Sequence, residues 1–178
     1  MSAVRLFFAL WPDAPTRRKL RKVCRDAVAF SGGRPVPPQH YHLTLAFLGN
    51  VPVAQVPAIR AAATGVAAPT LTLQLDRFGY FSRARVLWIG PTEAPAELAQ
   101  LAASLWAALE PVGLQPELRP FHPHLTIARK VHRAPRDPQA RPVAWPVRGF
   151  VLVRSVTEPT GARYTVDQCF PEGSSNEP

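Results

Sequence analysis

An internal repeat constrains this chain more than any other feature of its sequence. The segment HYHLTLAF at residues 40–47 recurs as HPHLTIAR at residues 122–129, and five of the eight positions are identical. The two copies begin about half the length of the 178-residue chain apart. A repeat with this spacing predicts a fold built from two structurally similar halves.

Each copy of the repeat is predicted to be a strand that carries polar side chains on one face. Side chains alternate between the two faces of a strand, so His42 and Thr44 point one way and the leucines beside them point into the core. The second copy arranges His124 and Thr126 in the same manner. Two such strands related by a pseudo-twofold axis would bring two imidazoles and two hydroxyls into one groove.

This set of side chains suits chemistry on a phosphodiester. Opening a cyclic phosphate requires that one proton leave the attacking water and that another reach the leaving ribose oxygen. Histidine titrates near neutral pH, so a neutral copy and a protonated copy can coexist. The threonine hydroxyls can donate hydrogen bonds to the other phosphate oxygens. The pair therefore predicts metal-independent acid–base catalysis without a cofactor, with a bell-shaped pH–rate profile around neutrality.

Hydrophobic periodicity predicts how the rest of the chain is organised. Asp13 can cap a helix that ends at Gly32-Gly33, and Cys24 falls on the apolar stripe of that helix. Two further helices are expected over residues 53–63 and 95–109. Strands are expected over residues 4–11, 40–48, 71–75, 85–89, 123–128, 149–154 and 164–170.

Residues 130–148 contain four prolines and five basic residues, and proline at that density favours a long exposed loop over regular structure. Strands and helices interleave with no visible domain boundary. We therefore expect one α+β domain over residues 1–170, made of two similar lobes. Residues 171–178 are expected to form a disordered tail.

The two repeat copies resemble the HxTx motifs of the two-histidine phosphoesterase superfamily. Within it the chain is most similar to RNA 2′,3′-cyclic phosphodiesterases, formerly called 2′-5′ RNA ligases. The resemblance extends to RLFFAL at residues 5–10, HLTLAFLG at 42–49 and RPFHPHLTIAR at 119–129. Tyr164 also fits the closing pattern of the family, so the likeness covers nearly the whole chain.

The resemblance implies a bilobal fold in which two antiparallel sheets form a V-shaped cleft, with helices outside and the HxTx strands inside. It implies hydrolysis of 2′,3′-cyclic phosphate ends of RNA to 2′-phosphomonoesters, with possible reverse ligation. By this analogy His42 is the general acid and His124 the general base, although pseudo-symmetry permits the opposite assignment. Arg129 matches a family arginine that contacts phosphate. Strict alternation places Arg129 on the wrong face, so a bulge or strand end must release it.

His40 and His122 differ from the usual family pattern. Each lies two residues before a motif histidine and is therefore expected on the same strand face, so they could extend the phosphate site. They also create two HxH pairs, which leaves a metal-dependent hydrolase as an alternative. Against that alternative, no carboxylate lies near either pair in the sequence. Trp11, Phe47 and Phe121 could stack on a base, but buried packing is the expected role of each.

Composition indicates the class of binding partner and the cellular compartment of the protein. The net charge of +9, from 21 basic and 12 acidic residues, suits RNA, although an arginine-rich composition typical of a GC-rich genome would give the same charge. The basic run along the first helix is expected to be a solvated face. No membrane span, signal peptide or disulfide framework is indicated, which favours a cytoplasmic monomer.

Two other functions remain open from the sequence. The chain could be a module that binds RNA ends with incidental catalysis, although intact histidines in both copies argue against binding alone. It could instead be a phosphodiesterase whose substrate is a small cyclic nucleotide or a 2′-5′-linked oligonucleotide. Product analysis and comparison of substrates separate these possibilities.

Overall fold

The computed structural model describes residues 2–159 and 161–172, which fold as three helices and nine strands. The order is β1 Ala3–Leu10, α1 Ala14–Ser31, β2 Arg34–Pro35, β3 Leu43–Pro52, α2 Val56–Thr64, β4 Leu71–Phe81, β5 Val86–Gly90, α3 Ala96–Leu109, β6 Leu125–Arg129, β7 Gln139–Val147, β8 Phe150–Glu158 and β9 Gly161–Phe170. Short 3₁₀ turns precede β3 and α2 and follow α3. The expected tail falls mainly on residues 173–178, which lie outside the described residues.

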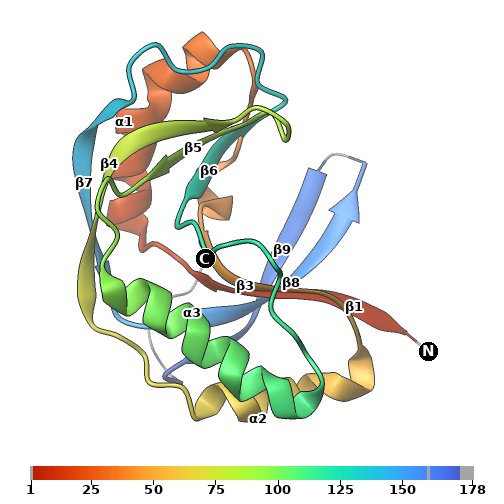
Figure 1. The fold of residues 1–178 in the computed structure, drawn as a ribbon. Helices are drawn as coiled ribbons and strands as arrows, with labels where there is room; N and C mark the ends of the chain where they lie inside the picture. Colours follow the sequence, from red (N-terminus) through yellow and green to blue (C-terminus); the bar gives the residue numbers. More distant parts are fainter. Residues whose placement is uncertain (1, 160, 173–178) are drawn as a thin grey trace.

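The strands make two antiparallel halves that meet at one residue pair. Their order is β7-β4-β5-β6-β3-β1-β8-β9, with β2 added beside β6. Leu43 of β3 pairs with Leu125 of β6, and this pair alone joins the halves into a continuous sheet. Figure 1 shows the two halves diverging from that junction. The α+β class with two antiparallel halves is confirmed, and the junction lies inside the repeat.

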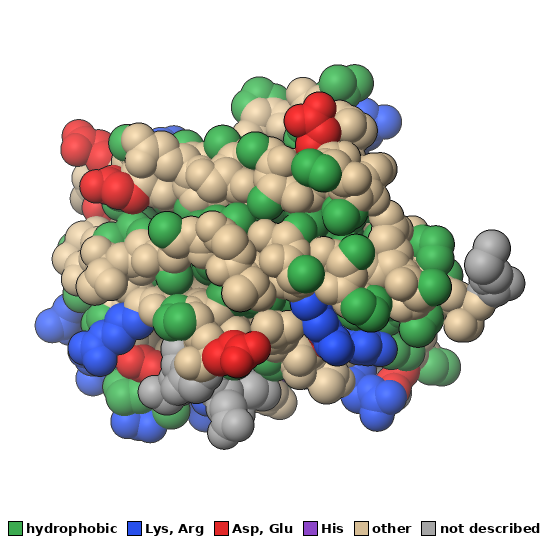
Figure 2. Space-filling view, turned by 90° about the horizontal axis from the view of Figure 1, so that it is seen from below, with side chains coloured by type: hydrophobic (Ala, Val, Ile, Leu, Met, Phe, Trp, Pro, Cys, Tyr) green, Lys and Arg blue, Asp and Glu red, His purple; other side chains and the backbone are tan. Residues whose placement is uncertain are grey.

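Helices α1 and α3 each cover the half opposite to the strand that they follow. Helix α1 follows β1 but packs against β5, β6 and β7, whereas α3 follows β5 but packs against β3 and α2. Figure 1 shows α1 along one half, and α2 and α3 along the other. On the face formed by α2 and α3, charged side chains lie mainly around the margin (Figure 2). Among the described residues, no helix is both long and apolar enough to cross a membrane.

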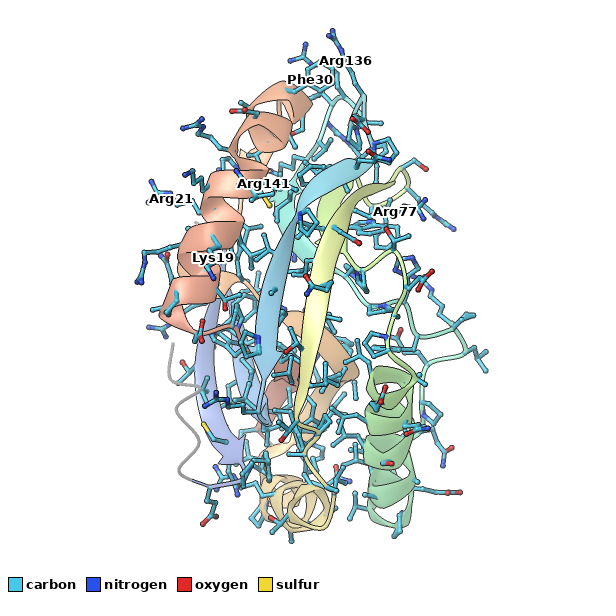
Figure 3. The ribbon with its side chains drawn as sticks, turned by 90° about the vertical axis from the view of Figure 1, so that its left-hand side faces the viewer. Lys19, Arg21, Phe30, Arg77, Arg136 and Arg141 are labelled. Atoms are coloured by element: carbon cyan, nitrogen blue, oxygen red, sulfur yellow. The ribbon has the colours of Figure 1, made fainter. Side chains whose placement is uncertain are left out.

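Helix α1 has the limits and the faces that its sequence predicts. The Asp13 side chain caps it by accepting a 2.8 Å hydrogen bond from the Thr16 amide, and Gly32 ends it with φ of 65°. Cys24 is buried on the apolar stripe, and burial raises the pKa of its thiol to about 12. Lys19 and Arg21 project outward (Figure 3), and the other basic residues of the run are exposed except for half-buried Arg17. The run is therefore mainly a solvated face, as expected.

The predicted loop over residues 130–148 is wrong for its second half, which forms strand β7. This strand lies at the edge of the sheet and pairs only with β4. Val143, Trp145 and Val147 are buried, whereas Pro142 and Pro146 occupy the alternate positions. On an edge strand, alternate backbone amides point away from the neighbouring strand, so proline there removes no hydrogen bond of the sheet.

An ion-pair cluster fixes β9 against the rest of its half. The Asp167 carboxylate accepts hydrogen bonds from Arg60 of α2 at 2.6 and 2.8 Å and from Arg154 of β8 at 2.5 Å. Burial tends to raise the pKa of Asp167, but the two guanidinium groups hold it below its ordinary value. The cluster links α2, β8 and β9, and β9 carries Tyr164, which belongs to the site described next.

Candidate active site

The junction between the two halves sets the positions of both motif histidines. The histidines precede the strands instead of lying within them, because β3 begins at Leu43 and β6 at Leu125. This corrects the predicted strand limits. Since those two leucines pair directly, His42 and His124 enter the junction from its two ends.

All four polar residues of the two motifs lie on one face of this junction. Leu43 and Leu125 are fully buried in the main core, so the residues before and after each of them point to the opposite side. Continuing the antiparallel register by one residue sets Thr126 beside His42 and Thr44 beside His124. The two histidines then occupy diagonal positions on the same face, and the charge of His124 contributes to lowering the pKa of His42. This arrangement suits contact of both imidazoles with one phosphate group.

Both imidazoles are held by the same backbone interaction. His42 Nδ1 lies 2.7 Å from the carbonyl oxygen of His40, and His124 Nδ1 lies 2.7 Å from that of His122. A carbonyl oxygen only accepts, so each Nδ1 must carry a proton and donate it. This arrangement fixes the tautomer and leaves Nε2 as the nitrogen that exchanges protons in both rings.

Aromatic rings enclose His42 in the half that contains β1. The indole of Trp11 stacks on the imidazole, with ring centroids 5.3 Å apart and planes 8° apart. Phe7 and Tyr164 contact the same imidazole at 5.0 and 5.1 Å between centroids. The edge of Tyr164 also meets His40 at 5.2 Å. His42 is therefore packed on several sides, and its orientation is fixed before any ligand arrives.

His124 has a similar aromatic surround in the other half. Phe81 meets it edge to face at 4.9 Å between centroids, and Trp88 lies at 6.2 Å. Trp88 lies against Gly79, where an added Cβ would come within 1.9 Å of the indole. Gly79 pairs directly with Trp88 across β4 and β5, so a side chain there would displace the ring. The glycine is thus required for this packing.

Burial and nearby positive charge lower the pKa values of both imidazoles. Burial is the main reason that the pKa of His42 falls to about 4, and the charges of Arg129 and His124 act in the same direction. The pKa of His124 is also lowered, first by burial and then by His122 and Arg129. The backbone hydrogen bonds oppose both shifts only in part. Without a bound anion, both rings are therefore neutral at pH 7.

A β-bulge brings Arg129 to the face of the histidines. The register between β5 and β6 shifts, because Leu87 pairs with Ala128 while Trp88 pairs with Thr126. One extra residue of β6 therefore fits between these pairs, and Ala128 is buried after buried Ile127. The extra residue shifts the alternation of side chains along β6 by one position. Arg129 therefore lies on the same face of the strand as Thr126. The effect of its charge on both imidazoles agrees with this placement.

The structure brings together most of the residues singled out from the sequence. The group comprises His40, His42, Thr44, His122, His124, Thr126, Arg129 and Tyr164. Phe121 instead packs against the main core, whereas Phe47 belongs with Phe7 and Trp11 to a small cluster on the face of the histidines. Sequence reasoning missed Phe81 and Trp88, because an aromatic residue in an apolar strand has the same pattern as a core residue.

Metal ligation has little support in the arrangement of these groups. Within the described parts of the chain, no set of three or more His, Cys, Asp or Glu side chains is arranged to hold a metal ion.

Comparison with known proteins identifies close relatives over almost the full chain. A sequence profile for the 2′-5′ RNA ligase superfamily matches residues 11–158. The RNA 2′,3′-cyclic phosphodiesterase of Thermus thermophilus is 36% identical over 179 residues, covering 94% of this chain and 89% of the relative. The protein of the same name from Escherichia coli is 37% identical over 156 residues, covering 86% of this chain and 83% of the relative.

Solved structures give the same result. The crystal structure of E. coli LigT in apo form superimposes with a TM-score of 0.84 at 34% identity, covering 95% of this chain and 97% of that one. E. coli LigT complexed with 3′-AMP superimposes with a TM-score of 0.85 at 34% identity, covering 94% and 97% of the two chains. Fold and sequence therefore agree across both halves.

Proposed function

Because the chain belongs to the 2′-5′ RNA ligase superfamily, we propose that it is an RNA 2′,3′-cyclic phosphodiesterase that hydrolyses cyclic phosphate ends to 2′-phosphomonoesters. One observation carries the proposal beyond the likeness to relatives. Two His–Thr pairs meet face to face at the Leu43–Leu125 junction, and each imidazole is held by a 2.7 Å backbone hydrogen bond. This arrangement has the two proton-transfer groups that in-line opening of a cyclic phosphate requires.

The proposed reaction uses the Nε2 atoms of the two histidines. His124 Nε2 takes a proton from water as the water oxygen forms a bond to phosphorus. The bond between phosphorus and the 3′ oxygen breaks, and His42 Nε2–H gives its proton to that oxygen. The products are a 2′-phosphomonoester and a free 3′ hydroxyl. The same steps with a 5′ hydroxyl in place of water would join the two RNA ends through a 2′-5′ phosphodiester, with the 3′ oxygen again as leaving group.

The other polar groups of the site stabilise the charge that develops on phosphate. Thr44 and Thr126 can each donate a hydroxyl hydrogen bond to a non-bridging oxygen, and Arg129 supplies a guanidinium at the same face. Tyr164 holds the rings of His40 and His42 in place by edge contacts. No metal or cofactor has a step in this mechanism.

We place the enzyme in the cytoplasm as a monomer, with residues 1–170 acting as one domain of two lobes. Its substrate is RNA with a 2′,3′-cyclic phosphate terminus. The basic charge of the chain supports an RNA partner, because a positive protein attracts a polyanion over long range.

The proposed function is tested by product analysis of an RNA oligomer that ends in a 2′,3′-cyclic phosphate. We expect conversion to the 2′-phosphate only, at an unchanged rate in EDTA, because His42 protonates the 3′ oxygen and no metal takes part. The position of the phosphate can be determined by ³¹P NMR or by resistance to a 3′-phosphatase. A 3′-phosphate product would contradict the assigned leaving group, and loss of activity in EDTA would favour a metal-dependent hydrolase.

The lowered pKa values move the expected pH profile of kcat/KM to the acidic side of neutrality. This parameter reports the free enzyme, in which the reactive form has one proton on the pair. We therefore expect a maximum between about pH 4, the pKa of His42, and the ordinary histidine value near 6.5. Bound phosphate raises both pKa values by its negative charge, so the maximum of kcat should lie at higher pH than that of kcat/KM. Coincident profiles centred above pH 8 would contradict this account.

A further inference from the structure

A pocket of about 250 Å³ lies beside the His124 half of the site, and the proposed reaction does not use it. Its lining consists of Arg77, Trp88, Pro91, Thr92, Ala94, His122 and Pro123. Arg77 of β4 pairs with Gly90 of β5. Two residues later on the same strand, Gly79 lies against the indole of Trp88. Figure 3 shows Arg77 on the side of β4 away from α1. The pocket therefore opens on the same face of the sheet as the histidine pair.

The pocket continues directly from the catalytic histidine. His122 belongs to its lining, and the centroid of its ring is 6.0 Å from that of His124. Trp88 also lines the pocket and contacts both imidazoles, at 4.9 Å for His122 and 6.2 Å for His124. Trp88 is only 7% exposed, and the space it fills exists because Gly79 has no side chain. The pocket is thus preformed, and one imidazole ring separates it from the site of reaction.

The groups in this pocket suit a phosphodiester. A guanidinium binds phosphate oxygens with two parallel hydrogen bonds, and an imidazole N–H can donate a third. Arg77 is exposed and makes no ion pair with any described residue. The lining contains no carboxylate. Two acidic residues, Asp76 and Glu93, line a neighbouring depression, where Asp76 accepts a 2.7 Å hydrogen bond from the Thr92 amide.

We infer that this pocket binds the phosphodiester on the 5′ side of the terminal nucleotide, with Arg77 as its main ligand. The inference rests on the proposed function. The terminal nucleotide of the substrate carries one phosphate on its 2′ and 3′ oxygens and another on its 5′ oxygen, with a single ribose between them. When the cyclic phosphate lies between His42 and His124, a second anion site one ring away is within reach of the 5′ phosphate. Arg77 then makes the enzyme selective for RNA chains over nucleoside cyclic phosphates.

The test compares kcat/KM on three substrates: uridine 2′,3′-cyclic phosphate, the same nucleoside with a 5′ phosphate, and the dinucleotide that ends in it. Hydrogen bonds to a charged group are worth about 1.5–3 kcal/mol, so the two substrates with a 5′ phosphate should be preferred roughly tenfold or more. Arg77→Gln should reduce that preference to within about threefold of unity, since one guanidinium supplies most of it. Arg141→Gln, which removes the same charge from an exposed position of β7, should keep the preference.

Each other outcome has a defined meaning. A wild-type enzyme that cleaves all three substrates equally well would overturn the subsite and leave the proposed function intact. A preference for the dinucleotide alone would show recognition of the upstream nucleoside and overturn the role of Arg77 as a phosphate ligand. Equal loss of preference in Arg141→Gln would show that the preference comes from the general positive charge of the protein and not from binding in the pocket. Failure to cleave any of the three would instead reject the proposed function. The wild-type comparison needs no variant, so it remains decisive if Arg77→Gln folds poorly.

Discussion

His124→Ala should lower the rate of hydrolysis of a cyclic-phosphate RNA by a factor of about 10²–10⁴, with binding of the RNA end largely retained. The expected loss is that of a general base, because water alone must then lose its proton without help. The loss should appear in kcat and not mainly in KM, since the imidazole acts in the transition state. Single-turnover kinetics and a binding measurement with the 2′-phosphate product separate the two effects. His42→Ala should cause a loss of similar size.

The matched control is His132→Ala, which removes an exposed histidine that lies outside the site and contacts Arg85 instead. It should hydrolyse RNA at the wild-type rate. Normal turnover by His124→Ala would dismiss the acid–base pair and favour a module that binds RNA ends. Thermal unfolding of each variant should be measured, so that loss of folded protein is not taken for loss of catalysis.

The second prediction separates the acid from the base. A substrate in which sulfur replaces the 3′ oxygen of the cyclic phosphate has a leaving group that needs little protonation, because thiols ionise near pH 8.5. His42→Ala should therefore hydrolyse this substrate within about tenfold of wild type, although it loses about 10²–10⁴ on the ordinary substrate. His124→Ala should stay slow on both, since its attacking water still lacks a base.

The assignment has a physical difficulty that this experiment addresses. Burial lowers the pKa of His42 to about 4, so the proposed acid is unprotonated in the free enzyme at pH 7. It must gain its proton when the anionic substrate binds and raises its pKa. Rescue of His124→Ala in place of His42→Ala by the sulfur substrate would reverse the two roles. Rescue of neither variant would contradict proton transfer to the 3′ position.

The repeat was sufficient to predict which residues the structure brings together at the centre of the candidate site, because two independent constraints coincide there. A structural histidine needs no threonine two residues later, and still less a second copy with the same pattern. The leucines between these polar residues are fully buried, as alternation predicts, so the polar face could be deduced without coordinates. The limits of the strands could not be deduced from the sequence, because they depend on where β3 and β6 separate.

Arg129 and Trp88 show why the rest of the site was harder to predict. Alternation along β6 assigns Arg129 to the wrong face, and only the register shift opposite Leu87 and Trp88 corrects it. A bulge leaves no distinct pattern in a run of small and branched apolar residues. Trp88 lies in an apolar strand with no polar neighbour. Its sequence context therefore cannot distinguish a residue that lines the candidate site from a residue of the core. Both features depend on pairing between distant strands.

Strand β7 shows the same limitation in the fold. Proline at residues 142 and 146 predicts a loop when the chain is considered alone, but β7 is an edge strand, in which alternate backbone amides need no partner in the sheet. Whether a strand is at an edge or in the middle is a property of the assembled sheet. Local propensity therefore failed where tertiary context decides which backbone amides need partners.

The central claim is that both imidazoles bind one phosphate group, and NMR titration tests it most directly. Inorganic phosphate would be added to protein labelled with ¹⁵N on histidine, and the Nε2 signals of His42 and His124 would be followed. We expect both signals to shift with the same dissociation constant toward the protonated form, because one anion contacts both rings. A shift of one signal alone, or two shifts with different constants, would contradict a shared site.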